Sequence, residues 1–150
     1  MRITDITITV VDLGPLAQPF WNSIIKTSRS AQARIEIHTD AGVTGMGSCS
    51  ASGSARATIL GGIKAKLVGQ DPLRINQLWD LMYMGGTRKP VAKGDYIACM
   101  SMVDIALWDL AGKVLGQPAW VLAGGAQERV WAYAAGGYYA EGKGPAELAV

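Results

Sequence analysis

The fold of this chain is decided by residues 104–125, which read Asp-Ile-Ala-Leu-Trp-Asp-Leu-Ala-Gly-Lys-Val-Leu-Gly-Gln-Pro-Ala-Trp-Val-Leu-Ala-Gly-Gly. Apolar residues continue upstream and surround the helical axis on nearly all sides. This pattern predicts a central, buried helix from about Asp95 to Leu115. Gly116-Gln117-Pro118 ends the helix, because glycine permits a left-handed turn and proline cannot continue the helix. Trp120 to Leu122 then form a short further turn before Gly124-Gly125.

The two acids of this stretch are interpreted as structural. Asp104 and Asp109 are five residues apart, which separates them by about 140° around a helix. They therefore cannot face one bound atom together. Asp109 lies four residues before Lys113, a spacing that favours an ion pair on the helix surface.

Upstream, the N-terminal third alternates apolar and polar residues. The alternation predicts strands at residues 5–10, at 33–38 and from Val43 onward, since side chains of a strand point to opposite faces in turn. Residues 39–42, Thr-Asp-Ala-Gly, predict the turn of a hairpin. Residues 14–30 contain glycine and proline and are expected to form a loop. The result is a three-stranded antiparallel meander.

The middle of the chain changes to a helical period. Residues 54–68 have helical composition and end at Gly69. Asp71-Pro72 then predicts the start of a second helix, in which Ile75, Leu78 and Met82 mark one face before Gly85-Gly86 ends it. Residues 87–94 form a basic loop that carries Arg88, Lys89 and Lys93.

The last 25 residues follow a third pattern. Residues 130–134, Val-Trp-Ala-Tyr-Ala, are a continuous apolar run, as expected for a strand buried on both faces. A glycine-rich loop, 136–144, leads to the opening turn of a helix at Pro145. This is the start of a βα unit, and a parallel sheet cannot be built from one strand. We therefore predict an α+β domain at 1–125, then the first strand, loop and helix start of a further domain at 126–150.

Composition limits the possible functions. The chain has 150 residues, 49% of them hydrophobic, and a net charge of +2. These values exclude intrinsic disorder and give no reason to expect a nucleic-acid partner. No apolar run approaches the length of a membrane span, and the N-terminus lacks the pattern of a signal peptide. Cys49 and Cys99 are expected to be thiols of a cytoplasmic protein. The only histidine, His38, is expected on the polar face of its strand.

The glycine-rich loop resembles a phosphate-binding loop in spacing. Residues 137–144, Gly-Tyr-Tyr-Ala-Glu-Gly-Lys-Gly, lie between an expected strand and an expected helix. However, Gly144 stands where a Ser or Thr hydroxyl would bind Mg²⁺. We therefore interpret the segment as the loop of a βα unit and not as a nucleotide site.

Order and spacing resemble one family over essentially all 150 residues. The stretch 104–113, then Gly116-Gln-Pro118 and 122–125, is similar to the N-terminal signature of the enolase superfamily. The branch it resembles is the mandelate racemase and muconate lactonizing enzyme type. The hairpin at 39–47 resembles the same family's turn and third strand.

The resemblance implies an N-terminal capping domain, a meander with a helical bundle, followed by a truncated (β/α)₇β barrel of TIM type. Enzymes of this family remove the proton α to a carboxylate and stabilise the enediolate on Mg²⁺. The products are racemised acids, dehydrated sugar acids or cycloisomerised lactones, which makes the enzymes isomerases or lyases. In the family the bases and the three acidic Mg²⁺ ligands lie on later barrel strands. The expectation is therefore that this chain holds no catalytic residue and no metal and is inactive alone.

What the resemblance does carry over is a lid. The family's two capping loops close over the barrel and correspond here to residues 14–30 and 48–54. The first loop of the barrel also reaches the catalytic face. The expected substrate-binding residues are Phe20, Trp21, Lys26, Ser48, Ser50, Tyr138 and Tyr139.

Three readings of function remain at this point. The parent is expected to be a Mg²⁺-dependent acid-sugar dehydratase or racemase, homo-oligomeric, with a small carboxylate or sugar acid as substrate. A cycloisomerase of the same superfamily is an alternative. A free-standing, non-catalytic α+β binding module is another. In a chain without the remaining barrel, Trp131 and Tyr133 are expected to be exposed and to favour self-association.

Overall fold

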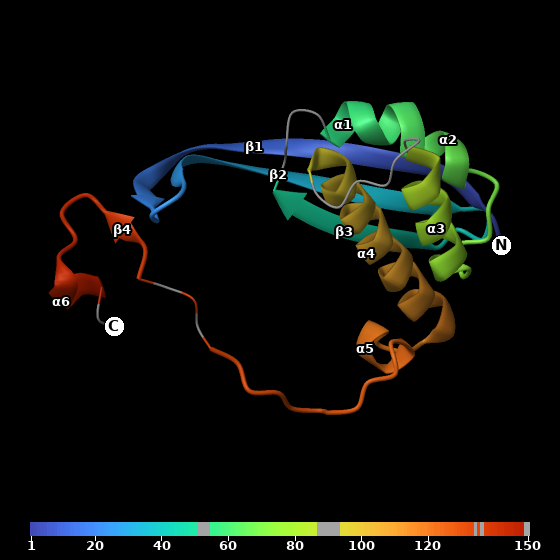
Figure 1. Ribbon diagram of the computed structural model, residues 1–150. Coiled ribbons are helices and arrows are strands. Elements are labelled where there is room, and N and C mark those ends of the chain that lie inside the picture. The colour runs from blue at the N-terminus through green and yellow to red at the C-terminus, as the bar shows by residue number, and fades with distance from the viewer. Residues whose placement is uncertain (51–54, 87–93, 134, 136, 149–150) are drawn as a thin grey trace.

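The structure, a computed structural model, describes residues 1–50, 55–86, 94–133, 135 and 137–148. Its centre is an antiparallel sheet with strand order β3-β2-β1-β4. Three long strands form the meander: β1 (Ile3–Trp21), β2 (Lys26–Thr39) and β3 (Thr44–Ser50). Helices cover one face of this sheet, as Figure 1 shows. The α+β class and the three-stranded meander predicted from the alternation are confirmed.

The first and third helices have nearly the predicted boundaries, whereas the second begins at Ile75 and not at the predicted Asp71-Pro72. The first is divided into α1 (Ala55–Thr58), a wider π-helical turn η1 (Ile59–Ile63) and α2 (Lys64–Leu67). Then come α3 (Ile75–Gly86) and the long α4 (Asp95–Leu115). The short α5 (Ala119–Leu122) follows Pro118, and α6 (Pro145–Leu148) lies near the C-terminus. Gly116 ends α4 with a φ of 63°, the left-handed conformation that glycine adopts without strain. The predicted basic loop, 87–93, lies outside the described residues.

The core lies between the sheet and the helices. The inward faces of β1 and β2 contribute isoleucines, and one side of α4 contributes most of the remainder. Alternate strand positions and helix positions three or four apart meet in this layer, which is the reason the sequence periodicities predicted it. Its largest buried side chains are Ile3, Ile6, Ile35, Ile37, Ile59, Ile63, Leu67, Leu78, Met82, Met100, Met102 and Leu107.

Two glycines let the edge strand β3 lie directly against α4. A Cβ atom at Gly45 would come within 2.2 Å of the Ala106 carbonyl oxygen, and one at Gly47 within 2.3 Å of the Met102 carbonyl oxygen. Two strand residues and four helix residues each span about 6 Å, so the two contacts repeat in register. Strand and helix backbones thus approach as closely as only glycine permits.

The loop predicted at residues 14–30 is wrong in part. These residues extend the hairpin: β1 continues to Trp21, and β2 begins at Lys26. The register shifts between Asp12 and Gly14 and again between Pro15 and Phe20. Gly14 and two prolines interrupt the apolar alternation, but β1 pairs with β4 only at Phe20 and Trp21, so the part of β1 before them has a free edge that accommodates such irregularities. The hairpin therefore projects beyond the helices (Figure 1).

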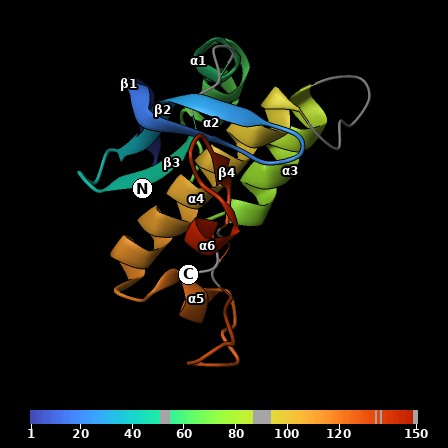
Figure 2. The same cartoon turned by 90° about the vertical axis from the view of Figure 1, so that its left-hand side faces the viewer.

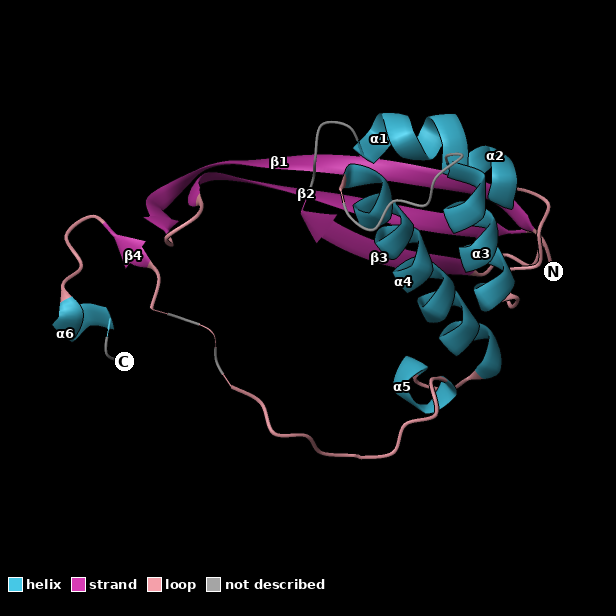
Figure 3. Cartoon of the chain, viewed as in Figure 1, coloured by secondary structure: helices cyan, strands magenta, loops and turns pink. Residues whose placement is uncertain are grey.

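The strand predicted at residues 130–134 is also not found. Residues 130–133 form no strand, and the side chains of Val130, Trp131 and Tyr133 are 75%, 103% and 91% exposed. Ala134 lies outside the described residues. A parallel strand needs neighbours to pair with, and residues 123–133 instead lead away from α5 as a loop that joins no strand (Figure 3). The exposure expected for Trp131 and Tyr133 is confirmed.

The histidine and the cysteine that can be placed behave as predicted. His38 lies on the helix-free face of the sheet, where its ring nitrogens are 3.1 Å from Thr7 Oγ1 and 3.3 Å from Thr44 Oγ1. Cys99 is buried on α4, while the side chain of Cys49 lies outside the described residues. Within the described ranges, no helix is long and apolar enough to cross a membrane.

Candidate functional site at the hairpin tip

The tip of the β1–β2 hairpin meets the C-terminal segment. Strand β4 (Tyr139–Ala140) pairs antiparallel with the end of β1, so that Phe20 faces Ala140 and Trp21 faces Tyr139. Figure 2 shows this end of the molecule, with β4 and α6 beside the hairpin. Residues more than a hundred positions apart in the sequence therefore form one surface.

The hairpin tip is stabilised by local polar contacts. The Asn22 side-chain oxygen accepts hydrogen bonds from the backbone N–H groups of Ile24 and Ile25, both at 2.8 Å. Such a side-chain turn is the reason asparagine is frequent in reversals of the chain. Further down, Asp12 accepts a 2.6 Å bond from Arg29 across the hairpin and a 2.9 Å bond from Gly14 N–H. The Arg29 hydrogen bond lowers the pKa of the Asp12 carboxyl from its usual value, assisted by the Gly14 amide.

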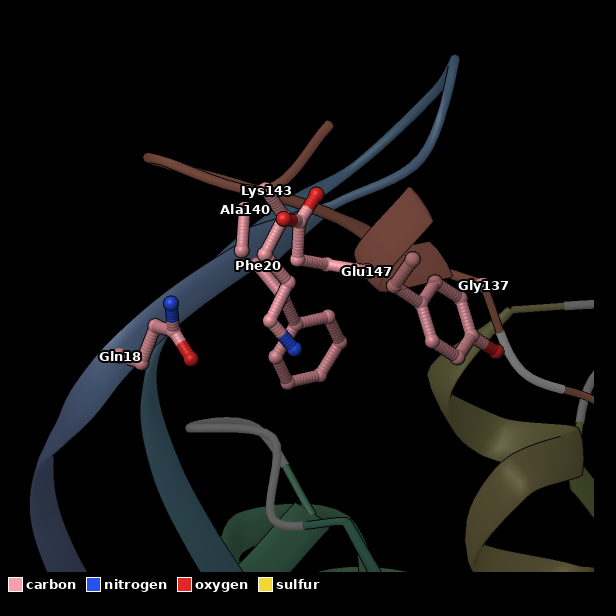
Figure 4. Close-up of a pocket in the computed structure, with 7 residues that line it drawn as sticks. Gln18, Phe20, Gly137, Ala140, Lys143 and Glu147 are labelled. Carbon is pink, nitrogen blue, oxygen red and sulfur yellow. The ribbon is translucent and has the colours of Figure 1, made fainter. Parts of the chain in front are cut away.

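A cavity of about 320 Å³ opens where the two segments meet. Figure 4 shows that Gln18 and Phe20 enter it from β1 and that Lys143 and Glu147 enter it from the C-terminal segment. The ring centroids of Phe20 and Tyr138 are 5.2 Å apart at an angle of 48°, a tilted contact that joins the segments. The lining thus combines an aromatic wall with a cation and a carboxylate, as in many sites for small polar ligands.

A second hollow, of about 420 Å³, lies on the turn side of the hairpin. It is lined by residues 21–26 together with Glu141. The Lys26 ammonium lies 5.7 Å from the centroid of the Trp21 ring, within the range of a cation–π interaction. Ile24, next to it, is 86% exposed. This hollow therefore combines the Lys26 cation and the Glu141 carboxylate with polar and apolar side chains of the turn.

The structure brings together some of the predicted site residues and separates others. Phe20 and Tyr138 share the first cavity, and Trp21 and Lys26 share the second. Tyr139 is paired with Trp21 in the sheet and lies between the two. Ser48 lies elsewhere, on β3, where it lines a hollow on the helix-free face with Thr9 and Arg34. The side chain of Ser50 lies outside the described residues, as does most of the 48–54 loop.

Sequence reasoning missed three residues that line the first cavity with polar or charged side chains. Gln18 belongs to the segment predicted as a loop, and its side chain approaches the Glu141 carbonyl oxygen at 3.4 Å. Lys143 and Glu147 lie in and after the phosphate-loop-like spacing. Glu147 Oε2 accepts a hydrogen bond from the Gly144 N–H at 2.9 Å. A phosphate bound in this loop would need the same N–H, which a carboxylate of the chain already occupies. This contact argues against the phosphate-loop interpretation.

The described residues do not form a site for a metal ion. No group of three or more His, Cys, Asp or Glu side chains in the described part of the chain is arranged to hold one. The acids of α4 are separated as predicted: Asp109 binds Lys113, whereas Asp104 contacts Trp108. Burial raises the pKa of Asp104 from its usual value, and the Trp108 hydrogen bond lowers it by a smaller amount. The Mg²⁺ implied by the resemblance therefore does not fit the residues described, and no chemical step is derived through it.

A meander covered on one face by helices, with cavities at the tip of a projecting hairpin, defines an α+β domain of the capping type. Residues 5–124 match the family model described as the mandelate racemase / muconate lactonizing enzyme N-terminal domain. This match covers most of the chain, and the chain belongs to that family.

Curated relatives cover the chain but are much longer. The D-galactonate dehydratase of Cronobacter sakazakii is 39% identical over 119 residues, which are 76% of this chain and 29% of that protein. The D-galactarolactone cycloisomerase of Agrobacterium fabrum is 32% identical over 139 residues, which are 92% of this chain and 36% of that protein. The chain therefore spans about a third of the length of these relatives.

Solved structures agree with this assignment. A protein described as a mandelate racemase/muconate lactonizing enzyme matches with a TM-score of 0.78 at 30% identity, over 92% of this chain and 38% of that one. A racemase from Streptomyces coelicolor, solved with bound magnesium, matches at 23% identity with a TM-score of 0.66, over 73% of this chain and 32% of that one. The second match is evidence for the fold alone.

Proposed function

We propose that the chain is the N-terminal portion of a Mg²⁺-dependent enzyme that removes the proton α to a carboxylate, an acid-sugar dehydratase or racemase. In this proposal residues 1–125 are the capping domain, and residues 126–150 begin the catalytic barrel. The family membership supports it, as do relatives that are named for D-galactonate and D-galactarolactone. The cycloisomerase alternative draws its support from the second of these relatives.

The observation that carries the proposal is the cavity between the hairpin tip and the C-terminal segment. A sugar acid presents one carboxylate and a chain of hydroxyl groups. Lys143 supplies a cation for the carboxylate, and Gln18 and Glu147 supply hydrogen-bonding groups for hydroxyls. Phe20 and Tyr138 form an aromatic wall of the cavity, against which the carbon chain of the substrate packs in this proposal. Lys26 and Trp21 extend this surface on the other side of β4.

In this proposal the chain selects and covers the substrate but does not perform the chemistry. The metal ligands and the bases are assigned to the barrel strands that follow in the parent protein, and Mg²⁺ supplies charge stabilisation there. Residues of this chain bind, orient and shield the substrate. Closure of such a lid strengthens electrostatic interactions in the site by removing water. The parent is proposed to be a cytoplasmic homo-oligomer.

A chimera tests the lid function. Residues 5–124 of this chain replace the matching domain of the Cronobacter sakazakii D-galactonate dehydratase. Dehydration of D-galactonate, in which the α-proton and the neighbouring hydroxyl leave as water and an α-keto acid forms, is followed by NMR with Mg²⁺. We expect a folded chimera that forms the α-keto acid, in which Phe20→Ala and Trp21→Ala raise KM. Arg74→Gln, distant from the hairpin, is the matched control and is expected to leave KM unchanged. A folded chimera that forms no α-keto acid, or one whose KM is unchanged by Phe20→Ala and Trp21→Ala, contradicts the proposal.

The chain alone separates the proposal from its rival. We expect no exchange and no α-keto acid when the purified 150-residue chain is incubated with Mg²⁺ and D-galactonate. A free-standing binding module predicts that residues 130–133 are ordered and protected from hydrogen exchange. Their exposure in the structure supports the proposal and leads us to expect rapid exchange.

A further inference from the structure

The free edge of strand β3 is occupied by two side chains of α4. β3 is the last strand of the sheet, because β2 pairs with it on one side only. Asp109 Oδ2 accepts the backbone N–H of Met46 at 2.7 Å. Lys113 Nζ donates to the backbone carbonyl oxygen of Thr44 at 2.9 Å and to Asp109 Oδ2 at 2.6 Å. The Met46 N–H and the Thr44 carbonyl, which both point away from β2, are thus hydrogen-bonded to the two members of an ion pair.

These two groups are the ones that a parallel strand would use. In a parallel ladder, one residue of an added strand donates its N–H to the carbonyl before the facing residue and accepts the N–H of the residue after it. With Gly45 as the facing residue on β3, those groups are the Thr44 carbonyl and the Met46 N–H. Lys113 supplies the donor and Asp109 supplies the acceptor at the same two positions.

We propose that the Asp109–Lys113 pair takes the place of one residue of a parallel strand and closes the edge of β3 to strand addition by a second copy of this chain. Unpaired strand edges are templates for association, and natural proteins block them with charges or covering elements. Here the close approach of α4 at Gly45 brings both side chains to the edge. The ion pair thereby occupies the hydrogen-bonding groups of the edge, and no additional strand is needed to cover them.

The same chain carries the segment that such an edge would accept. Residues 130–133 belong to no strand of the described sheet and expose Val130, Trp131 and Tyr133. β-Branched and aromatic residues of this kind favour strands. Met46 on β3 is itself 45% exposed and offers an apolar neighbour. Residues 130–133 of a second copy are therefore the strand that would pair with the edge of β3. The Asp109–Lys113 ion pair prevents this pairing. Residues 130–133 are available as the added strand in the 150-residue chain, where they are exposed, and not in the proposed parent enzyme, where they begin the barrel.

The test removes the pair in the full 150-residue chain. The double variant Asp109→Ala/Lys113→Ala leaves the net charge unchanged, and Asp80→Ala/Arg74→Ala is the matched control on the surface near α3. Hydrogen exchange of the Met46 amide is expected to be about 10- to 100-fold faster in the double variant, as for the loss of a bond to a charged acceptor. Sedimentation velocity is expected to show association at least about 10-fold tighter than in the wild type. The control is expected to match the wild type in both measurements.

A second pair of substitutions identifies the occupant. Adding Trp131→Ser/Tyr133→Ser to the double variant is expected to abolish the tighter association while Met46 continues to exchange rapidly. Association that persists in this quadruple variant overturns the assignment of residues 130–133 as the added strand. Unchanged Met46 exchange and unchanged association in the double variant overturn the role of the ion pair.

If the double variant does not unfold cooperatively, Lys113→Met and Lys113→Arg provide the test. Lys113→Met keeps the Asp109 bond to Met46 but frees the Thr44 carbonyl, so it is expected to associate more tightly than the wild type. Lys113→Arg keeps the donor and is expected to behave as the wild type. Equal association of both variants contradicts the proposal.

Discussion

Replacing Gly45 by alanine provides a direct test of the β3–α4 packing. The added Cβ atom would lie 2.2 Å from the Ala106 carbonyl oxygen and 2.5 Å from Leu110 Cβ. Both neighbours belong to the backbone or to the first side-chain atom of a buried helix, so neither can rotate away. To restore ordinary contact distances, α4 has to retreat from β3 by roughly 1 Å at this point.

The expected cost follows from that movement. A gap of this size forfeits about a quarter to a half of the dispersion energy of each contact it opens, and overpacked cores lose about 1–3 kcal/mol or more. Because the obstacle at Gly45 is backbone, we expect a loss near the upper figure, about 3 kcal/mol of unfolding free energy. For a chain of this length that corresponds to a fall in Tm of roughly 6–12 °C. Thermal and urea unfolding followed by circular dichroism measure both values.

Gly61→Ala is the matched control. A Cβ atom at Gly61 meets nothing within 4 Å, and its backbone is helical within η1. Alanine there restricts the unfolded chain and is expected to raise stability by about 0.4–1 kcal/mol. The packing argument is refuted if Gly45→Ala unfolds within about 0.5 kcal/mol of the wild type, or if both variants change stability equally.

Three further predictions concern single side chains. Burial raises the folded-state pKa of Asp104, so the stabilising contribution of this carboxyl is present below its unfolded pKa and is lost as the pH rises. Asp104→Asn is therefore expected to be more stable than the wild type at pH 7. In urea unfolding, the difference is expected to vanish below about pH 4. Tyr96 Oη donates to the Met82 carbonyl oxygen at 2.6 Å, and Tyr96→Phe is expected to lose about 1 kcal/mol, which an unchanged midpoint in urea would contradict. Phe20 joins the hairpin to the C-terminal segment, so Phe20→Ala is expected to speed tryptic cleavage after Lys143, whereas equal cleavage rates would show that the ring contact does not hold the segment.

Sequence periodicity was sufficient to predict the layer between sheet and helices. Ile6 and Ile35 alternate with polar residues, and Leu78 and Met82 repeat at helical spacing, so each pattern has one buried face. Such patterns identify secondary structure because burial of one face is a local property of strand and helix geometry. The closeness of β3 to α4 was not predicted, since Gly45 and Gly47 are read equally well as turn residues. Glycine is needed at both positions because each lies against α4, which is about sixty residues away in the sequence.

The candidate site was predicted less completely than the fold, and the cause is again distance along the chain. Phe20 and Tyr138 were both expected to bind substrate, and they meet in one cavity. Lys143 and Glu147 were not expected there, because their place depends on β4 pairing with the hairpin tip. A pairing between residues 20–21 and 139–140 leaves no periodic signal in either segment. Strand pairing of high sequence separation is set by tertiary contacts and not by local pattern.

Asp109 makes one contact that the four-residue helical spacing predicts and another, with β3, that this spacing does not predict. The four-residue spacing predicts its ion pair with Lys113, and the 2.6 Å contact confirms it. On an exposed helix such a pair contributes only about 0.3–0.5 kcal/mol. Helix stability therefore explains little about why either residue is present at its position. The contacts with Met46 N–H and the Thr44 carbonyl give the pair a second task at the sheet edge. A helix pair that satisfies strand groups links two elements, so its removal is expected to change association more than it changes helix stability.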